Sequence, residues 1–224
     1  MSETIKICGL TTPETLTAAL RADADMVGFV FFPKSPRHLS FDAARALARM
    51  ARGAAEIVAL SVDADDATLD AIVNATEPDY LQLHGSETPE RAQEIQRKFG
   101  VSAVKAIGVS EAADFAKADA YKGKCDALII DAKPPKGAVL PGGNGIAFDW
   151  RLAWNFHPRK PWMLSGGLDP TNVAQAVAQS RTRAVDVSSG VESAPGVKDI
   201  GKIKAFIAAA RAAFDTLNSD GSGQ

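Results

Sequence analysis

The sequence has few of the features that mark disulfide-rich, membrane or nucleic-acid-binding proteins. It contains only 2 cysteines in 224 residues, too few for a disulfide framework. No apolar run approaches the ~18 residues that a membrane span needs. The net charge is -2, and no block of Lys and Arg provides a footprint for nucleic-acid phosphates. The first ten residues lack the basic flank and apolar core of a secretory signal. We therefore expect a cytoplasmic protein that binds neither a membrane nor nucleic acid.

Metal-ligand spacings are also missing, since CxxC, HxH and HExxH do not occur. We predict neither a metal site nor a cofactor. A disulfide is not expected either, because Cys8 closes one apolar run whereas Cys125 opens another. In parallel strands the two would lie at opposite ends, roughly 20 Å apart for a six-residue strand. That separation exceeds the Cα distance of about 7 Å that a disulfide can bridge.

Eight short apolar runs, rich in β-branched residues, recur along the chain at intervals of roughly 25–30 residues. They occupy residues 5–8, 26–32, 56–62, 79–84, 101–108, 125–131, 161–166 and 184–190. Most are too short for helices and too apolar for strands with one solvated face. This pattern favours parallel strands that are buried on both faces.

Alanine-rich amphipathic stretches separate these runs and predict helices. Their starts carry typical capping residues: Thr12-Pro13, Ser40, Thr88-Pro89, Asp169-Pro170 and Asp199. Eight strand–helix units in order favour a closed (β/α)8 barrel, the TIM barrel of the α/β class, over an open doubly wound sheet. We predict one domain over residues 1–215, followed by a disordered polar tail at 216–224.

The sixth unit has the weakest helical pattern. A Pro- and Gly-rich segment, residues 132–147, follows Asp131 and precedes a short helical stretch at 149–156. Loops of this length inside a compact domain are usually lids or binding loops. We therefore expect residues 132–147 to lie over a functional site.

The alternation of side chains along the strands predicts a group of reactive residues inside one mouth of the barrel. In the first run, Ile5 and Ile7 suit the helix layer, so Lys6 and Cys8 point inward. The same rule turns Gln82, His84, Asp186 and Ser188 inward and places Asp131 at the rim. Each residue alone has an ordinary structural explanation: a buried thiol, a loop-orienting histidine or a turn-capping aspartate. Their convergence at the carboxyl ends of the strands favours catalysis.

Two glycine-bearing turns, residues 165–173 and 188–199, follow the seventh and eighth runs. Glycine lets the backbone approach a ligand, and in such barrels these turns commonly hold phosphate. The residues predicted to hold the phosphate are Gly166, Gly167, Ser189 and Gly190, and Ser188 is a further predicted substrate-binding residue. On the opposite side, Arg37 lies in a proline-stiffened loop and could pair with a carboxylate through its planar fork. The expected ligand is thus a small phosphate ester with a second anionic end.

Seven segments between residues 6 and 199 resemble the phosphoribosylanthranilate isomerase family of tryptophan biosynthesis. They are KICGLT, GFVFFPKSPR, LQLHG, LIIDA, GGNG with FDW, LSGGLDPTNV, and VDVSSGVE followed by PGVKD. Together they cover nearly every loop at the proposed mouth. One departure is Asn144, where the family often has threonine, and another is the stretch PPKGAVLP, whose length varies. Both departures bear on loop behaviour and not on the chemistry.

The resemblance implies a metal-free Amadori rearrangement of N-(5'-phosphoribosyl)anthranilate. By this analogy Asp131 is the general acid that opens the furanose ring, and Cys8 is the thiolate base that removes the C2' proton. Arg37 would hold the anthranilate carboxylate, and the glycine turns would hold the phosphate. Asp186 and His84 would orient the substrate.

Other barrel enzymes that act on phosphosugars are the main alternatives. A pentose-phosphate epimerase needs paired metal-binding histidines, a pattern that His38, His84 and His157 do not supply. An indole-glycerol-phosphate synthase relies on lysines at strand ends, but Lys6 lies below the rim and Lys105 is no clear substitute.

A different class of function is a regulator that binds a phosphate ester without catalysis. Such a protein would be expected to carry substitutions at Cys8 or Asp131, and both residues are present. The sequence leaves the oligomeric state open between a monomer and a homodimer.

Overall fold

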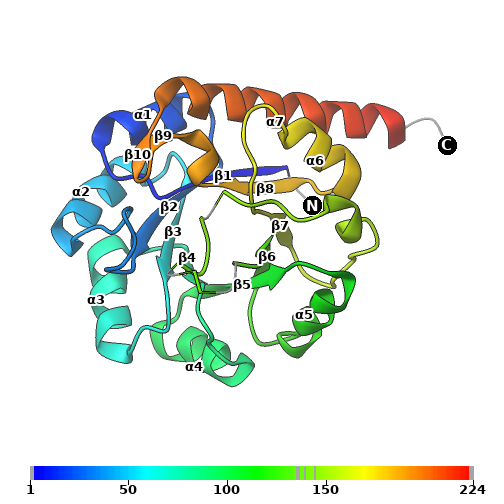
Figure 1. Cartoon of the computed structure of the whole chain (residues 1–224). Coiled ribbons are helices and arrows are strands. Elements are labelled where there is room, and N and C mark those ends of the chain that lie inside the picture. The colour runs from blue at the N-terminus through cyan, green and yellow to red at the C-terminus, as the bar shows by residue number, and fades with distance from the viewer. Residues whose placement is uncertain (1–2, 135–136, 139, 144, 222–224) are drawn as a thin grey trace.

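A computed structural model describes residues 3–134, 137–138, 140–143 and 145–221. Eight parallel strands close into a barrel in chain order, with β1 paired to both β2 and β8 (Figure 1). The strands are β1 (Thr4–Cys8), β2 (Met26–Phe31), β3 (Glu56–Ser61), β4 (Tyr80–Leu83), β5 (Ser102–Val109), β6 (Ala127–Ala132), β7 (Trp162–Leu164) and β8 (Ala184–Val187). The predicted (β/α)8 barrel is confirmed.

Helices surround the strands (Figure 1). They are α1 (Pro13–Arg21), α2 (Phe41–Ala51), α3 (Asp66–Thr76), α4 (Pro89–Phe99), α5 (Lys117–Ala120), α6 (Val173–Ser180) and α7 (Ile200–Gly221), with short 3-10 helices η1 (Ala112–Ala116), η2 (Trp150–Ala153) and η3 (Ser189–Val191). The side chains of the predicted caps Thr12, Ser40 and Thr88 each accept a hydrogen bond from the backbone N–H of the residue three positions later.

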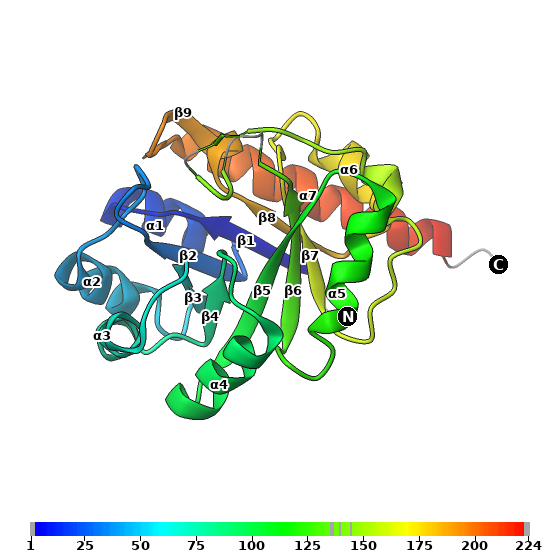
Figure 2. The same cartoon turned by 60° about the horizontal axis from the view of Figure 1, so that its bottom comes forward.

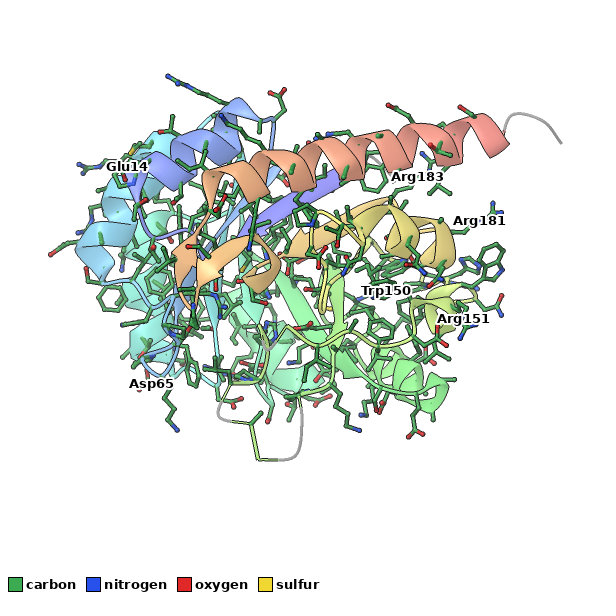
Figure 3. All side chains as sticks on the ribbon, turned by 45° about the horizontal axis from the view of Figure 1, so that its top comes forward. Glu14, Asp65, Trp150, Arg151, Arg181 and Arg183 are labelled. Carbon is green, nitrogen blue, oxygen red and sulfur yellow. The ribbon has the colours of Figure 1, made fainter. Side chains whose placement is uncertain are left out.

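Two helix predictions are inaccurate. The α6 helix begins at Val173 and not at Asp169-Pro170, because the Asp169 carboxylate accepts the N–H groups of Thr171 and Asn172 in a preceding turn. The helical stretch expected at 149–156 is only the short 3-10 helix η2. This helix packs beside α6 at the corner where Trp150 and Arg181 are labelled in Figure 3.

The C-terminal part differs further from expectation. The eighth strand ends at Val187, and an unpredicted antiparallel hairpin of β9 (Glu192–Ala194) and β10 (Val197–Lys198) follows η3. The α7 helix continues through residues 216–221, where a disordered tail was expected, and residues 222–224 lie outside the described residues. Among the described residues, none of the helices has the length and apolar character required to span a membrane.

The interior of the barrel has an apolar part and a polar part. Seven buried apolar side chains form one cluster near the amino ends of the strands. Two of them belong to the first residues of β2 and β8. The seven are Met26, Val58, Val104, Ala106, Ile129, Met163 and Ala184. Nearer the carboxyl ends, the buried interior side chains of Lys6, Gln82 and Asp186 are polar. The apolar cluster therefore fills the floor beneath the mouth of the barrel.

Candidate active site

A pocket opens at the carboxyl ends of the barrel strands, and its empty space, counted together with the open solvent at its mouth, is about 800 Å³. Every residue predicted to contact the ligand lines this cavity except Gly190. Gly190 instead lies against the β7–α6 loop, where an added Cβ would come 3.0 Å from the Asp169 Cα and closer still to Leu168. Its small size permits the two loops to touch, and its assignment to the phosphate site stays a prediction.

Cys8 is the last residue of β1, and its side chain is buried at the bottom of the cavity. An added Cβ at Gly28 would come 2.9 Å from the Cys8 Sγ, so a glycine on β2 leaves room for the sulfur. Burial raises the pKa of the Cys8 thiol, whereas the nearby cations of Lys6 and Lys198 act to lower it. Cys8 and Cys125 are both free thiols, as predicted.

The buried Asp131 and the partly buried His84 form a pair at the rim. The Asp131 Oδ1 accepts the N–H of Ala132 at 2.8 Å, and its Oδ2 lies 3.2 Å from the His84 Nε2. Gly142 lies directly over this pair, since an added Cβ would come 2.5 Å from the His84 Nε2 and 2.7 Å from the Asp131 Oδ2. In Figure 2, the described residues of the loop after β6 lie on the same side of the barrel as β9. Asn144, in the same loop, lies outside the described residues.

Lys6 connects three strands beneath the mouth. Its Nζ donates to the Gln82 Oε1 at 2.7 Å and to the Asp186 Oδ1 at 2.9 Å, and the Asp186 Oδ2 accepts from the Ser165 hydroxyl at 3.2 Å. Burial lowers the pKa of Lys6, but the Asp186 carboxylate and Cys8 outweigh it, and the net pKa is raised. Lys6 is therefore an ammonium ion. Strand alternation turned Lys6 and Gln82 inward but did not indicate this network.

Arg37 is held differently from the prediction. Its Nε and Nη2 donate to the Glu192 Oε1 and Oε2 at 2.7 and 2.8 Å, so the planar fork expected for a ligand is occupied by Glu192. The Nη1 edge lies beside Gly143, where an added Cβ would come 2.8 Å from that nitrogen, and Arg37 lines the cavity. Gly9, at a φ of 75°, has no side chain to obstruct Arg37. A ligand carboxylate would meet the Nη1 edge and not the fork.

Glu192 and Lys198 are site residues that the sequence did not reveal. The Lys198 Nζ is buried and donates to the Glu192 Oε1 and the Ser188 carbonyl, both at 2.8 Å. Burial raises the pKa of Glu192, but the bonds from Arg37 and Lys198 dominate and the net pKa is lowered. The Glu192 carboxylate therefore connects Arg37, in the loop after β2, with Lys198, which in turn binds the carbonyl of Ser188 after β8. The only signal was the VSSGVE motif, which gave no partner for the glutamate.

The turns after β7 and β8 have the backbone expected of an anion-binding site. Gly166 and Gly167 have φ values of 87° and 66°, and an added Cβ at Gly167 would come 2.5 Å from the Ala147 N. Ser188 and Ser189 line the same side of the cavity, and the Ser188 hydroxyl donates to the Cys8 carbonyl at 3.2 Å. Burial lowers the pKa of Lys198, although the Glu192 carboxylate opposes this shift, and the protonated lysine adds positive charge behind Ser188. These features suit a phosphate group.

The described part of the chain holds no group of three or more His, Cys, Asp or Glu side chains arranged to hold a metal ion. What the site does offer is a thiol, a carboxyl group and anion-binding loops around one cavity. That combination can donate a proton at one point of a bound phosphate ester and remove one at another.

Comparison with known proteins agrees with this chemistry. Residues 5–209 match the family model described as N-(5'phosphoribosyl)anthranilate (PRA) isomerase. The N-(5'-phosphoribosyl)anthranilate isomerase of Nitrobacter winogradskyi is 57% identical over 217 residues, which cover 97% of this chain and 96% of that protein. The enzyme of the same name from Agrobacterium fabrum is 51% identical over 223 residues, covering 100% and 98%.

Solved structures give the same result. The phosphoribosyl anthranilate isomerase of Thermotoga maritima superimposes with a TM-score of 0.82 at 35% identity, covering 95% of this chain and 100% of that one. A second such structure, in complex with reduced 1-(o-carboxyphenylamino)-1-deoxyribulose 5-phosphate, gives a TM-score of 0.81 at 34% identity and the same coverage. The chain belongs to the N-(5'-phosphoribosyl)anthranilate isomerase family.

Proposed function

We propose that the protein catalyses the Amadori rearrangement of N-(5'-phosphoribosyl)anthranilate to 1-(2-carboxyphenylamino)-1-deoxyribulose 5-phosphate, a step of tryptophan biosynthesis. The observation that carries this proposal is the placement of Cys8 and Asp131 in one cavity between the Arg37 edge and the glycine turns. The family of the chain and the ligand in the solved relative, a reduced form of the proposed product, support the same reaction.

Asp131 begins the reaction as the general acid. Its proton passes to the furanose ring oxygen, the bond between C1' and that oxygen breaks, and the nitrogen lone pair forms a Schiff base at C1'. The Cys8 thiolate then takes the proton from C2', and the electron pair of that C–H bond moves toward the iminium nitrogen to give an enolamine. A proton added at C1' and one lost from the C2' hydroxyl complete the ketone. The protons taken up and released balance.

The cations around Cys8 support its role as a base. Burial works against a thiolate, and the ammonium groups of Lys6 and Lys198 stabilise the negative charge that forms on the sulfur. Asp186 holds Lys6 in place from β8. The site thus supplies a base without a histidine partner for the thiol.

The Arg37 Nη1 edge and the two glycine turns define the length of the substrate. The anthranilate carboxylate would lie at Arg37, and the phosphate at Gly166, Gly167, Ser188 and Ser189. In this arrangement the sugar lies between the two anionic ends, over Cys8 and Asp131. His84 and Asp186 orient it through their contacts with Asp131 and Lys6, respectively.

The decisive assay follows the loss of anthranilate-type fluorescence when purified protein is mixed with freshly prepared phosphoribosylanthranilate. We expect an enzyme-dependent decay, faster than the spontaneous breakdown of the substrate, with the rearranged ribulose phosphate as the product by mass spectrometry and NMR. Protein that leaves the substrate to its spontaneous hydrolysis would refute the proposed activity.

Cellular location and assembly are part of the same proposal. We place the protein in the cytoplasm, as a monomer or a homodimer, acting on a small phosphorylated molecule. One solved structure from Thermotoga maritima is described as monomers generated from a dimeric isomerase. Sedimentation analysis of the purified chain distinguishes the two states, and a larger assembly would contradict this part of the proposal.

Replacement of Arg37 by alanine is expected to raise KM by roughly 10- to 100-fold, because one hydrogen bond to a charged group contributes about 1.5–3 kcal/mol. The effect on kcat should be smaller, since Arg37 does not touch the reacting carbons. Steady-state kinetics measure both constants. Arg45→Ala is the control, because Arg45 pairs with the exposed Asp42 on α2. An unchanged KM in Arg37→Ala, with normal thermal unfolding, would remove Arg37 from the carboxylate site.

A further inference from the structure

An unbroken line of polar side chains runs from the centre of the barrel to Asp131. The Lys6 Nζ lies 2.7 Å from the Gln82 Oε1, the Gln82 Nε2 lies 2.9 Å from the His84 Nδ1, and the His84 Nε2 lies 3.2 Å from the Asp131 Oδ2. Lys6 and Gln82 are fully buried, and Asp131 is nearly so. Water therefore has little access to the inner links of this line.

The hydrogen-bonding chemistry of Lys6 determines the orientation of the Gln82 amide and the tautomer of His84. An ammonium group only donates hydrogen bonds, so the part of Gln82 that faces Lys6 must be the carbonyl oxygen. The amide NH2 then faces His84, and an NH2 group also only donates. The His84 Nδ1 must therefore accept, which leaves the single proton of a neutral imidazole on Nε2, facing Asp131.

We infer that Lys6 and Gln82 are positioning residues that hold His84 as the neutral Nε2–H tautomer, so that His84 donates to Asp131 and cannot take its proton. A second proton on Nδ1 would point at the Gln82 NH2 group. Rotation of the amide to relieve that contact would turn the NH2 toward the Lys6 ammonium, with which Asp186 also pairs. Both alternatives place two donors face to face.

The consequence for the reaction rests on the proposed function. A general acid must keep its proton until the substrate is in place, and a histidine at this distance from a carboxyl group would ordinarily compete for that proton. His84 held as the Nε2–H tautomer does not compete. Once the proton has moved to the ring oxygen, the Asp131 carboxylate receives N–H bonds from His84 and Ala132, which stabilise its new charge.

The protonation state of His84 can be observed without any substrate. The chain contains only 3 histidines, so protein labelled with 15N-histidine gives few signals in a long-range 1H–15N spectrum. The His84→Asn variant identifies the His84 signals. We expect a protonated Nε2 and an unprotonated Nδ1 in the wild-type protein near neutral pH. A proton on Nδ1 would overturn the inference. This readout is independent of turnover, so its failure and a failure of the proposed activity are distinguishable.

The Gln82→Glu variant tests what holds the tautomer. The new carboxylate still accepts from Lys6, but it offers an acceptor to the His84 Nδ1, so Nδ1 is expected to gain a proton. With His84 either charged or able to accept at Nε2, Asp131 delivers its proton less readily, and kcat should fall at least tenfold with little change in KM. The matched control is Gln175→Glu, an exposed residue on α6. Its 15N pattern and kinetics should remain those of the wild type.

A neutral variant separates this role from a general loss of stability. Gln82→Met removes both hydrogen bonds without adding charge, and we expect mixed His84 tautomers in a protein whose circular dichroism is unchanged. A wild-type nitrogen pattern in either folded Gln82 variant would overturn the inference. If Gln82→Glu does not fold, Gln82→Met and the wild-type spectrum decide the question.

Discussion

Asp131→Asn is expected to lower kcat by roughly 10²- to 10⁴-fold, the usual contribution of general acid catalysis. An amide cannot supply the proton that opens the furanose ring, while its size matches that of the carboxyl group it replaces. KM should change little, because Asp131 is not assigned to either anionic end of the substrate. Steady-state fluorescence kinetics give both constants.

The same substitution should also reduce stability by about 1–3 kcal/mol, because an amide cannot accept hydrogen bonds on both sides. One side of Asp131 faces the Ala132 N–H and the other faces His84, so the NH2 group of asparagine must oppose one of them. Thermal unfolding measures this loss. Asp119→Asn, at an exposed position on α5, is the control for both readouts. A folded Asp131→Asn variant with wild-type kcat would eliminate Asp131 as the acid.

Cys8→Ser is expected to produce a loss of similar size in kcat, again about 10²- to 10⁴-fold. The serine hydroxyl fits the space of the thiol but holds its proton far more tightly, so Lys6 and Lys198 cannot convert it to a base. The limb of kcat/KM that rises with pH should belong to Cys8. Because burial raises the pKa of this thiol above its ordinary value, the reactive thiolate increases as the pH rises through the alkaline range.

The pH profile of the variant completes this test. In Cys8→Ser the rising limb assigned to the thiol should disappear. Cys125→Ser provides the matched control, since Cys125 is also a buried free thiol but lies at the amino end of β6, 3.3 Å from the Lys160 Nζ. Retention of the rising limb in Cys8→Ser, or its loss in Cys125→Ser, would contradict the assignment.

The sequence predicted the barrel well because its strands are predominantly apolar and its helix caps are strong. Strand alternation also located Cys8, His84, Asp131 and Asp186, since a period of two fixes which face of a strand looks into the barrel. Where helical signals were weak, the prediction was less accurate. The 149–156 stretch is a short 3-10 helix, and α7 continues beyond residue 215.

The contacts within the site were harder to predict, because they join residues far apart in the chain. Glu192 occupies the fork of Arg37 from 155 positions away, on a hairpin that lay inside a presumed loop. Lys6 meets Asp186 across 180 positions. Periodicity can turn a side chain inward, but it does not identify the side chain that it will meet across the barrel.

The apolar cluster at the amino ends of the strands has a consequence for engineering. None of its seven side chains is among the residues that line the main cavity in the described part of the chain. Exchanges of similar volume there, such as Ile129→Leu or Met163→Leu, therefore act on the melting temperature and leave the catalytic groups in place. A protein engineer could first stabilise the fold through this cluster. The stabilised protein would then tolerate destabilising substitutions at the mouth that adapt it to a different phosphosugar.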